Sequence, residues 1–164
     1  MGTGPGHGLN FGSTEGSNNE QTKKDSILSL ASTIKKINYY RNELPATAPI
    51  KIPKTAQIIV QDKPKYKQVK YKWYEKDVRY EVRWHTKTPR SPSYEKDSWV
   101  VERHIKGKGY GKNSHIGKDE ILVGKKWISK DEWTNAIRAK NTNKATKKQK
   151  ELLKNGHFKC KKWL

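Results

Sequence analysis

The stretch Arg79–Pro89 holds the residues best suited to chemistry, because charged, imidazole and hydroxyl side chains recur there at strand spacing. Alternate residues of a strand point to opposite sides, so Tyr80, Val82 and Trp84 would form a core face. The other side would carry ionisable groups and then two hydroxyls before Pro89 ends the ladder: Arg79, Glu81, Arg83, His85, Thr86 and Thr88. Such a row has the parts for acid–base catalysis on an anionic substrate.

RNA is a substrate that these groups could cleave, because its 2′-OH is a built-in nucleophile. An enzyme then needs a base for the 2′-OH proton, an acid for the leaving 5′-oxygen and a cation for the phosphate. We expect His85 to transfer one proton and Glu81 or Glu102, with His104 as the less favoured choice, to transfer the other. Arg83 or Arg103 would bind the phosphate, and Thr86 and Thr88 would position the phosphate.

Glu102 and His104 belong to a second alternating run, Ser98–Ile105. They can come opposite Glu81 and His85 only if the two runs pair antiparallel, and the register of such a pair cannot be read from sequence. A structural interpretation therefore stays open, in which the carboxylates form cross-strand ion pairs on a solvated face and His85 caps a loop.

The charge balance favours a polyanionic partner. Lys and Arg total 36 against 16 Asp and Glu, which gives a net charge of +20, whereas solubility rarely needs more than about 8. Six Trp and eight Tyr accompany these cations, a combination that suits base stacking. The residues expected to bind nucleic acid are Lys70, Lys72, Lys87, Arg90, Lys106, Lys108 and Lys112, the last three in a Gly- and Lys-rich loop without P-loop spacing.

Several classes of site are disfavoured. The single cysteine, Cys160, rules out an internal disulfide and a multi-cysteine zinc site. No apolar run approaches the roughly 18 residues that span a membrane, and we expect neither membrane insertion nor a signal peptide. We expect no cofactor; the alternative is Mg²⁺ or another divalent metal in a metal-dependent nuclease, bound near Asn113, His115, Asp119 and Glu120.

Three segments are expected to position these residues. Residues 1–24, rich in Gly, Ser, Asn and Thr, predict a flexible leader. Residues 25–53 predict a helix from Asp25 or Ser26 to about Asn42 and then an extended Pro-rich connector. Residues 54–164 predict a basic catalytic domain of α+β class, with a small antiparallel sheet of about four strands and two short C-terminal helices.

Within this domain, alternating runs predict strands and capping residues predict helices. Strand signals fall at 69–74, 79–85 and 98–105, with a tight turn at 75–77. Residues 56–60 predict a short strand or a helical turn, and residues 120–123 and 126–128, on either side of Gly124, predict one or two short strands. A capping box from Ser129 to Glu132 opens a helix to about Lys140, and Thr146 opens a second helix that Gly156 would end. The helix side chains expected to face inward are Trp133, Ala136, Ile137, Leu152 and Leu153.

Several short motifs occur in a distinctive order from about Val69 onward. They are Arg83-Trp-His-Thr-Lys-Thr-Pro89, Trp99-Val-Val-Glu-Arg103, the helix with Trp133 and Ala136-Ile137, Asn141-Thr-Asn-Lys-Ala-Thr146, and Leu152-Leu-Lys-Asn-Gly-His157. In this order they resemble the C-terminal toxin domains of bacterial polymorphic toxins of the Gram-positive LXG type.

The resemblance implies a cytotoxic nuclease, often a metal-independent ribonuclease of small α+β fold. It implies secretion or delivery into a target bacterial cell, with action in the cytoplasm of that cell. It also implies an immunity protein in the producing cell, which the charge of this chain predicts to be acidic. Residues 1–24 would then belong to the junction with a longer protein.

Two other function classes stay open. A metal-dependent DNase toxin would degrade DNA with magnesium and lose that activity in a chelator. A non-catalytic nucleic-acid-binding protein would bind tightly without cleavage, and His85→Ala would leave its binding unchanged. The residues and the resemblance together favour a cytotoxic ribonuclease that binds RNA.

Overall fold

The computed structural model describes residues 4–91 and 96–161. The chain divides into two compact units, Met1–Arg41 and Asn42–Leu164. The main element of the first unit is the helix α1 (Gly4–Asn38), which begins well before the expected cap at Asp25 or Ser26. Most of the expected leader therefore lies within α1, although its glycines have low helix propensity. Among the described helices, none has the length and apolar character that crossing a bilayer requires.

The connector that follows α1 is helical at first, where an extended chain was expected. A π-helical turn, Tyr39–Glu43, is followed by a 3₁₀ turn, Leu44–Thr47. Pro45 fits the first turn of that segment, because the first residues of a helix do not need their N–H groups for intrahelical bonds. Extended backbone begins only at Ala48, where φ is −74° and ψ is 153°.

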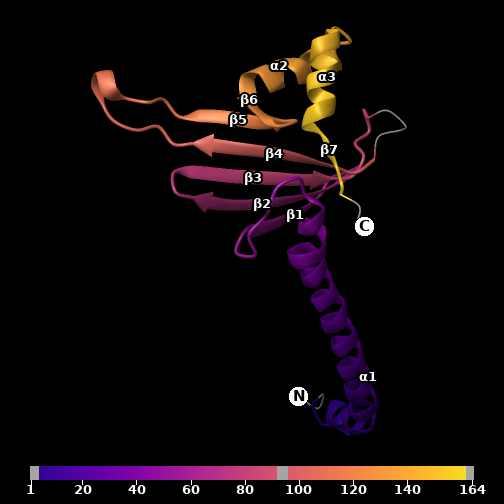
Figure 1. Cartoon of the computed structure of the whole chain (residues 1–164). Coiled ribbons are helices and arrows are strands. Elements are labelled where there is room, and N and C mark those ends of the chain that lie inside the picture. The colour runs from indigo at the N-terminus through magenta and orange to yellow at the C-terminus, as the bar shows by residue number, and fades with distance from the viewer. Residues whose placement is uncertain (1–3, 92–95, 162–164) are drawn as a thin grey trace. The chain divides into compact units, whose positions relative to one another are not determined.

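The second unit is built on an antiparallel sheet. Its strands within the described residues are β1 (Gln57–Asp62), β2 (Lys67–Glu75), β3 (Val78–His85), β4 (Ser98–Ile105), β5 (Lys118–Val123), β6 (Lys126–Ser129) and β7 (Phe158–Lys159). They form one sheet in the order β1-β2-β3-β4-β5-β6, and β7 pairs with the start of β4 (Figure 1). The α+β class is confirmed.

The predicted number of about four strands is too low for the described sheet, which has seven. β1 and β6 carry weak signals because each is short and half-exposed. β7 has only two residues, and so it shows no alternation. It exists because the chain returns from a helix to Ser98 and Trp99, the part of β4 that β5 leaves unpaired; this long-range contact has no local signal.

The register of β3 and β4 settles the pairing that the sequence left open. The two strands are antiparallel, with Glu81 opposite Glu102 and Arg79 opposite His104. On its other side β3 pairs with β2, where Lys70 lies opposite Arg83. One side of the sheet, which we call the polar face, therefore carries a row of charged and imidazole side chains: Lys70 and Lys72 of β2, Arg79, Glu81, Arg83 and His85 of β3, and Glu102 and His104 of β4.

The other face of the sheet carries the largest fully buried side chains, Tyr71 and Trp99, together with Val82. The indole Nε1 of Trp99 donates a hydrogen bond to Thr47 Oγ1 at 3.0 Å, so the 3₁₀ turn lies against this face. Leu44 in the same turn is buried. The core face predicted for β3 is confirmed at Val82 and Trp84, which are buried.

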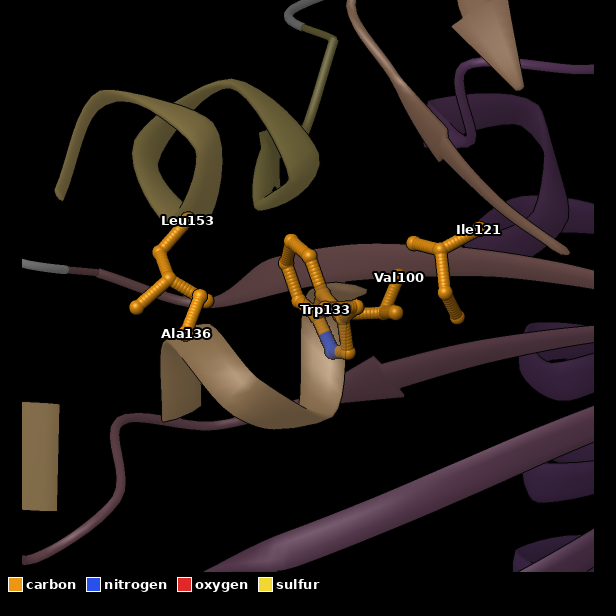
Figure 2. Close-up of a cluster of buried hydrophobic side chains, with 5 residues drawn as sticks. All are labelled: Val100, Ile121, Trp133, Ala136 and Leu153. Atoms are coloured by element: carbon orange, nitrogen blue, oxygen red, sulfur yellow. The ribbon is translucent and has the colours of Figure 1, made fainter. Parts of the chain in front are cut away.

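Two helices, α2 (Lys130–Asn141) and α3 (Lys147–Gly156), cover part of the polar face, over β4 to β6. The buried cluster between helices and sheet is drawn in Figure 2 and comprises Val100, Ile121, Trp133, Ala136 and Leu153. Over β2 and β3 the polar face stays uncovered by these helices, and its charged side chains remain partly exposed there.

The helix starts follow their predicted caps. Ser129 Oγ accepts a hydrogen bond from the backbone N–H of Asp131 at 3.1 Å, and Thr146 forms a capping box with Gln149. The prediction for Ile137 is wrong, because its side chain is 36% exposed. Gly156 ends α3 as predicted, but it also lacks space for a Cβ, which would overlap the ring of Trp133.

Candidate active site

His85 is the last residue of β3, and the sheet register places it between Gln68 of β2 and Ser98 of β4. Its Nδ1 lies 3.1 Å from the carbonyl oxygen of Thr86, so Nδ1 carries a proton and donates it. Its Nε2 lies 3.2 Å from Ser98 Oγ and, in the neutral ring, accepts the hydroxyl proton. These two bonds orient the ring and make Nε2 its proton-accepting atom.

A second imidazole, His157, lies beside His85. The pairing of β7 with the first residues of β4 brings the residue before β7 to the end of β3. The two rings are nearly perpendicular, at 88°, with centroids 5.8 Å apart. The Nδ1 of His157 donates to the carbonyl oxygen of Leu153 at 2.6 Å, and the ring centroid lies 5.2 Å from that of Trp133. Helix α3 and β7 together hold this imidazole in place.

The spacing of the two imidazoles suits joint action on one phosphodiester. A general acid or base must come within roughly 2.6–3.2 Å of the atom that gains or loses the proton. Rings 5.8 Å apart can therefore reach two oxygens of the same phosphate. Both rings are half-buried, which keeps them accessible while limiting their motion.

Two cations, Arg83 and Lys130, flank the carboxylate of Glu102 on the polar face. Arg83 comes two residues before His85 on the same face, roughly 7 Å along the strand. Its Nη2 is 3.6 Å from Glu102 Oε2, and Lys130 at the start of α2 forms an ion pair with Oε1. Glu102 is only 9% exposed, and the two cations offset the cost of burying its charge. The cluster therefore carries a net positive charge, and Arg83 is its member nearest to His85 along β3.

Glu81 is held in a similar way. Its two oxygens lie 3.7 Å from Lys70 Nζ and 3.7 Å from Lys72 Nζ, which are cross-strand ion pairs. Glu81 comes four residues before His85, roughly 13 Å along the strand, and Glu102 is its register partner. The imidazole of His157 therefore lies nearer to His85 than either expected carboxylate counterpart.

The two threonines bind other parts of the protein. The backbone N–H of Lys67 donates to Thr86 Oγ1 at 2.9 Å, and Thr86 N–H donates to Lys67 O at 2.9 Å. Thr88 Oγ1 lies 2.7 Å from Ser91 Oγ. Thr86 still contributes to the site, because its carbonyl oxygen orients His85. The backbone carbonyl of Thr86 thus orients His85, whereas the sequence analysis expected the Thr86 hydroxyl to position the phosphate.

Arg103 and His104 are not brought to His85. Arg103 lies on the opposite face, where its Nε and Nη2 donate to Glu120 Oε1 at 3.0 and 2.9 Å. Its guanidinium also lies 4.0 Å from the ring centroid of Trp127. His104 is on the polar face but near the far end of β4, with its Nδ1 2.6 Å from Asp119 Oδ1.

The residues considered for a metal ion are divided between two faces of β5. Asp119 contacts His104 on the polar face, whereas Glu120 contacts Arg103 on the other. The side chain of Asn113 lies outside the described part of the chain. Within the described residues, no group of three or more His, Cys, Asp or Glu side chains is arranged to hold a metal ion.

The basic residues expected to bind nucleic acid fall in three places. Lys70 and Lys72 lie on the polar face, and Lys87 and Arg90 are exposed in the loop that follows His85. Lys106, Lys108 and Lys112 are exposed in the segment between β4 and β5, residues 106–117, which we call the arm. Figure 1 shows the arm projecting beyond the sheet on the side of the β2–β3 turn.

The arm is tied to that turn at Asp77. Lys106 N–H donates to Asp77 O at 3.0 Å, and Lys108 Nζ lies 2.5 Å from Asp77 Oδ2. The hydrogen bond and then the charge of Lys108 hold the pKa of Asp77 below its usual range. Gly107 allows the two sides of the arm to approach, because a Cβ there would lie 2.7 Å from the carbonyl oxygen of His115.

Sequence reasoning missed three residues of this site: Ser98, Lys130 and His157. A histidine directly after a helix is favoured by the carbonyls at the helix end, and this was the available signal for His157. Its approach to His85 depends on β7, which has no local signal. Lys130 was hidden for a similar reason, since its partner Glu102 lies in a distant strand.

Comparisons with protein-family models, with curated proteins and with solved structures found no match to this chain.

Proposed function

We propose that this chain is a cytotoxic ribonuclease that cleaves RNA by metal-independent acid–base catalysis. One observation carries the proposal: the imidazoles of His85 and His157 lie 5.8 Å apart at the end of a positively charged sheet face. Two imidazoles supply both proton transfers, and the 2′-OH of RNA supplies the nucleophile. The reaction so proposed needs no cofactor.

His85 is assigned as the general base and His157 as the general acid. The Ser98 hydroxyl first releases Nε2 of His85, which then takes the 2′-OH proton. The 2′-oxygen attacks phosphorus, and the bond from phosphorus to the 5′-oxygen breaks. His157 gives its proton to that leaving oxygen, and a 2′,3′-cyclic phosphate remains. His157 suits the acid role because it follows the last turn of α3, where backbone carbonyls favour a positive group.

The phosphate is held chiefly by Arg83, which comes two residues before His85 on the polar face. Arg83 presents a planar guanidinium, and Lys130 adds a second charge across Glu102. Glu102 keeps both cations in position, so its role is structural support of the phosphate site. Lys87 and Arg90 are exposed in the adjoining loop and extend the positive surface along the RNA.

The proposed partner and location come from the resemblance to polymorphic toxins. The toxin would be secreted or delivered into a target bacterial cell and act on RNA in its cytoplasm. The net charge of +20 supports an acidic immunity protein in the producing cell. Covering the polar face with carboxylates would block RNA by charge and by shape.

The proposal is tested by incubating the purified chain with total RNA and with plasmid DNA, each with magnesium and with excess EDTA. Degradation of RNA in EDTA with intact DNA is the expected result. Degradation of DNA that requires magnesium would replace the proposal with a metal-dependent DNase. RNA binding without cleavage of either polymer would leave a non-catalytic nucleic-acid-binding protein.

A further inference from the structure

An exposed aromatic ring stands on the polar face away from the two imidazoles. Tyr74, near the end of β2, is 74% exposed, although it lies on a sheet face between charged rows. Its register partner on β3 is Arg79, which is also exposed. Both side chains point to the same side of the sheet as His85, since β3 residues 79 and 85 differ by an even number.

Arg79 differs from the other cations of the polar face. Lys70, Lys72 and Arg83 each lie within 3.7 Å of a carboxylate oxygen. Arg79 has no carboxylate at ion-pair distance among residues 4–91 and 96–161. Its guanidinium is thus available to an anion from outside the chain.

The backbone around this pair is held in place on both sides. Tyr74 and Arg79 flank the β2–β3 turn, whose Asp77 binds Lys106 N–H and Lys108 Nζ of the arm. Tyr74 and Arg79 therefore lie where β2 and β3 pair beside the turn, and Lys106 and Lys108 of the arm contact the same turn. A ring held on a sheet and surrounded by cations is the arrangement with which sheet proteins stack nucleobases.

We infer that Tyr74 and Arg79 form a subsite that stacks a base and binds a phosphate of single-stranded RNA. The inference rests on the proposed ribonuclease function, whose substrate it narrows to an extended single strand. Bases in a duplex are already stacked and paired, so they cannot cover a ring on a flat face without opening the helix.

The subsite lies at a distance from the bond that is cut. Arg79 is six residues before His85, roughly 20 Å along β3. Lys70, Lys72 and Arg83 lie on the path between the two places. A substrate must therefore span several nucleotides to use both, and a dinucleotide bound at His85 cannot reach Tyr74.

The test measures two quantities. Binding of a fluorescein-labelled ten-nucleotide single-stranded RNA is measured by anisotropy in a chain that also carries His85→Ala and His157→Ala, which prevents cleavage. Cleavage of a dinucleoside monophosphate is measured in chains with both histidines intact. Tyr74→Ala is compared with Tyr74→Phe, which keeps the ring, and with Tyr39→Ala, which removes an exposed tyrosine from the other unit.

Tyr74→Ala is expected to raise the Kd for the ten-nucleotide RNA by roughly 5- to 100-fold, the effect of one lost stacked base. Tyr74→Phe and Tyr39→Ala should bind like the parent chain, and Arg79→Ala should lower the slope of log K against log salt by about one. Dinucleotide cleavage should be unchanged by Tyr74→Ala.

Two results would overturn the subsite: Tyr74→Ala binding the single strand like the parent chain, or a duplex of the same sequence binding as tightly as the single strand. If either result is obtained while the parent chain still cleaves the dinucleoside monophosphate, only the subsite is excluded, and the proposed ribonuclease function stands. Absence of all RNA cleavage, with binding that still depends on Tyr74, would instead overturn the ribonuclease and retain the subsite.

Discussion

The imidazole rings of His85 and His157 are nearly perpendicular, with an interplanar angle of 88° and centroids 5.8 Å apart. His85 ends a central strand, whereas His157 follows the last helix. Each Nδ1 binds a backbone carbonyl oxygen, that of Thr86 or that of Leu153. In both neutral rings the proton then sits on Nδ1, and Nε2 is the atom that can exchange a proton with a substrate. The pair is therefore set by the main chain on both sides.

Replacing either imidazole should remove most of the RNA cleavage. His85→Ala and His157→Ala are each expected to lower kcat by roughly 10²- to 10⁴-fold, the usual loss when a general acid or base is removed. The double variant should be little worse than either single one, because the two groups act as a unit. His115→Ala, in the exposed arm, is the matched control and should cleave normally. Normal cleavage by His157→Ala would exclude His157 from the mechanism.

Gly156→Ala should disturb both stability and the site. The added Cβ overlaps the ring of Trp133, which is buried and also packs against His157. Overpacking of this kind costs roughly 1–3 kcal/mol, to be measured by urea denaturation with the cleavage rate in parallel. Lys154→Ala, at an exposed position of the same helix, should change stability by less than about 0.5 kcal/mol. Unchanged stability of Gly156→Ala would show that the helix end has room to move.

Substitutions of Arg83 and Arg103 should have different effects, one on RNA cleavage and the other on stability. Arg103→Met removes the bonds to Glu120 and the contact with Trp127, on the face away from His85. We expect a loss of about 1–2 kcal/mol in the free energy of unfolding and normal cleavage. Arg83→Met should instead lower kcat/KM for RNA, since it removes the phosphate-binding guanidinium. A larger loss of cleavage in Arg103→Met than in Arg83→Met would reverse the assignment of the phosphate clamp.

The strength of the Asp77–Lys108 ion pair, which holds the arm against the β2–β3 turn, should depend on pH. The pKa of Asp77 is lowered in the folded chain, chiefly by the hydrogen bond from Lys108. The contribution of this pair is therefore fully present above the unfolded pKa of an aspartate, near 3.9, and is lost as the pH falls through the lower folded pKa. Amide exchange at Lys106, which donates to Asp77 O, should quicken in Asp77→Asn relative to the parent chain at neutral pH. Equal exchange rates in the two chains would mean that the carboxylate does not hold the arm.

The sequence was informative about elements whose signals are local. Alternation in β3 predicted the buried face with Val82 and Trp84, and alternation in β2 and β4 predicted that these segments are strands. The capping residues Ser129 and Thr146 marked the starts of α2 and α3 within one residue. These signals depend on neighbours a few positions apart, and so one chain suffices to read them.

The site itself depends on contacts between distant segments, which no local pattern encodes. His157 meets His85 because a two-residue strand adds to the edge of β4. Arg103 shares a strand with Glu102, yet it lies on the other face, bound to Glu120. Alternation alone predicts that Arg103 and Glu102 lie on opposite faces of the sheet. It does not predict which residue contacts His85, because that depends on strand register and on the path of the C-terminal segment.

The pH dependence of kcat/KM tests the two-imidazole mechanism most directly. The parent chain, His85→Ala and His157→Ala would each be assayed in EDTA with a dinucleoside monophosphate across the pH range. The parent profile should be bell-shaped, because one imidazole must be neutral and the other protonated. His85→Ala should lose the fall at low pH, and His157→Ala should lose the fall at high pH. A His157→Ala profile that keeps both limbs at the parent rate would contradict the account.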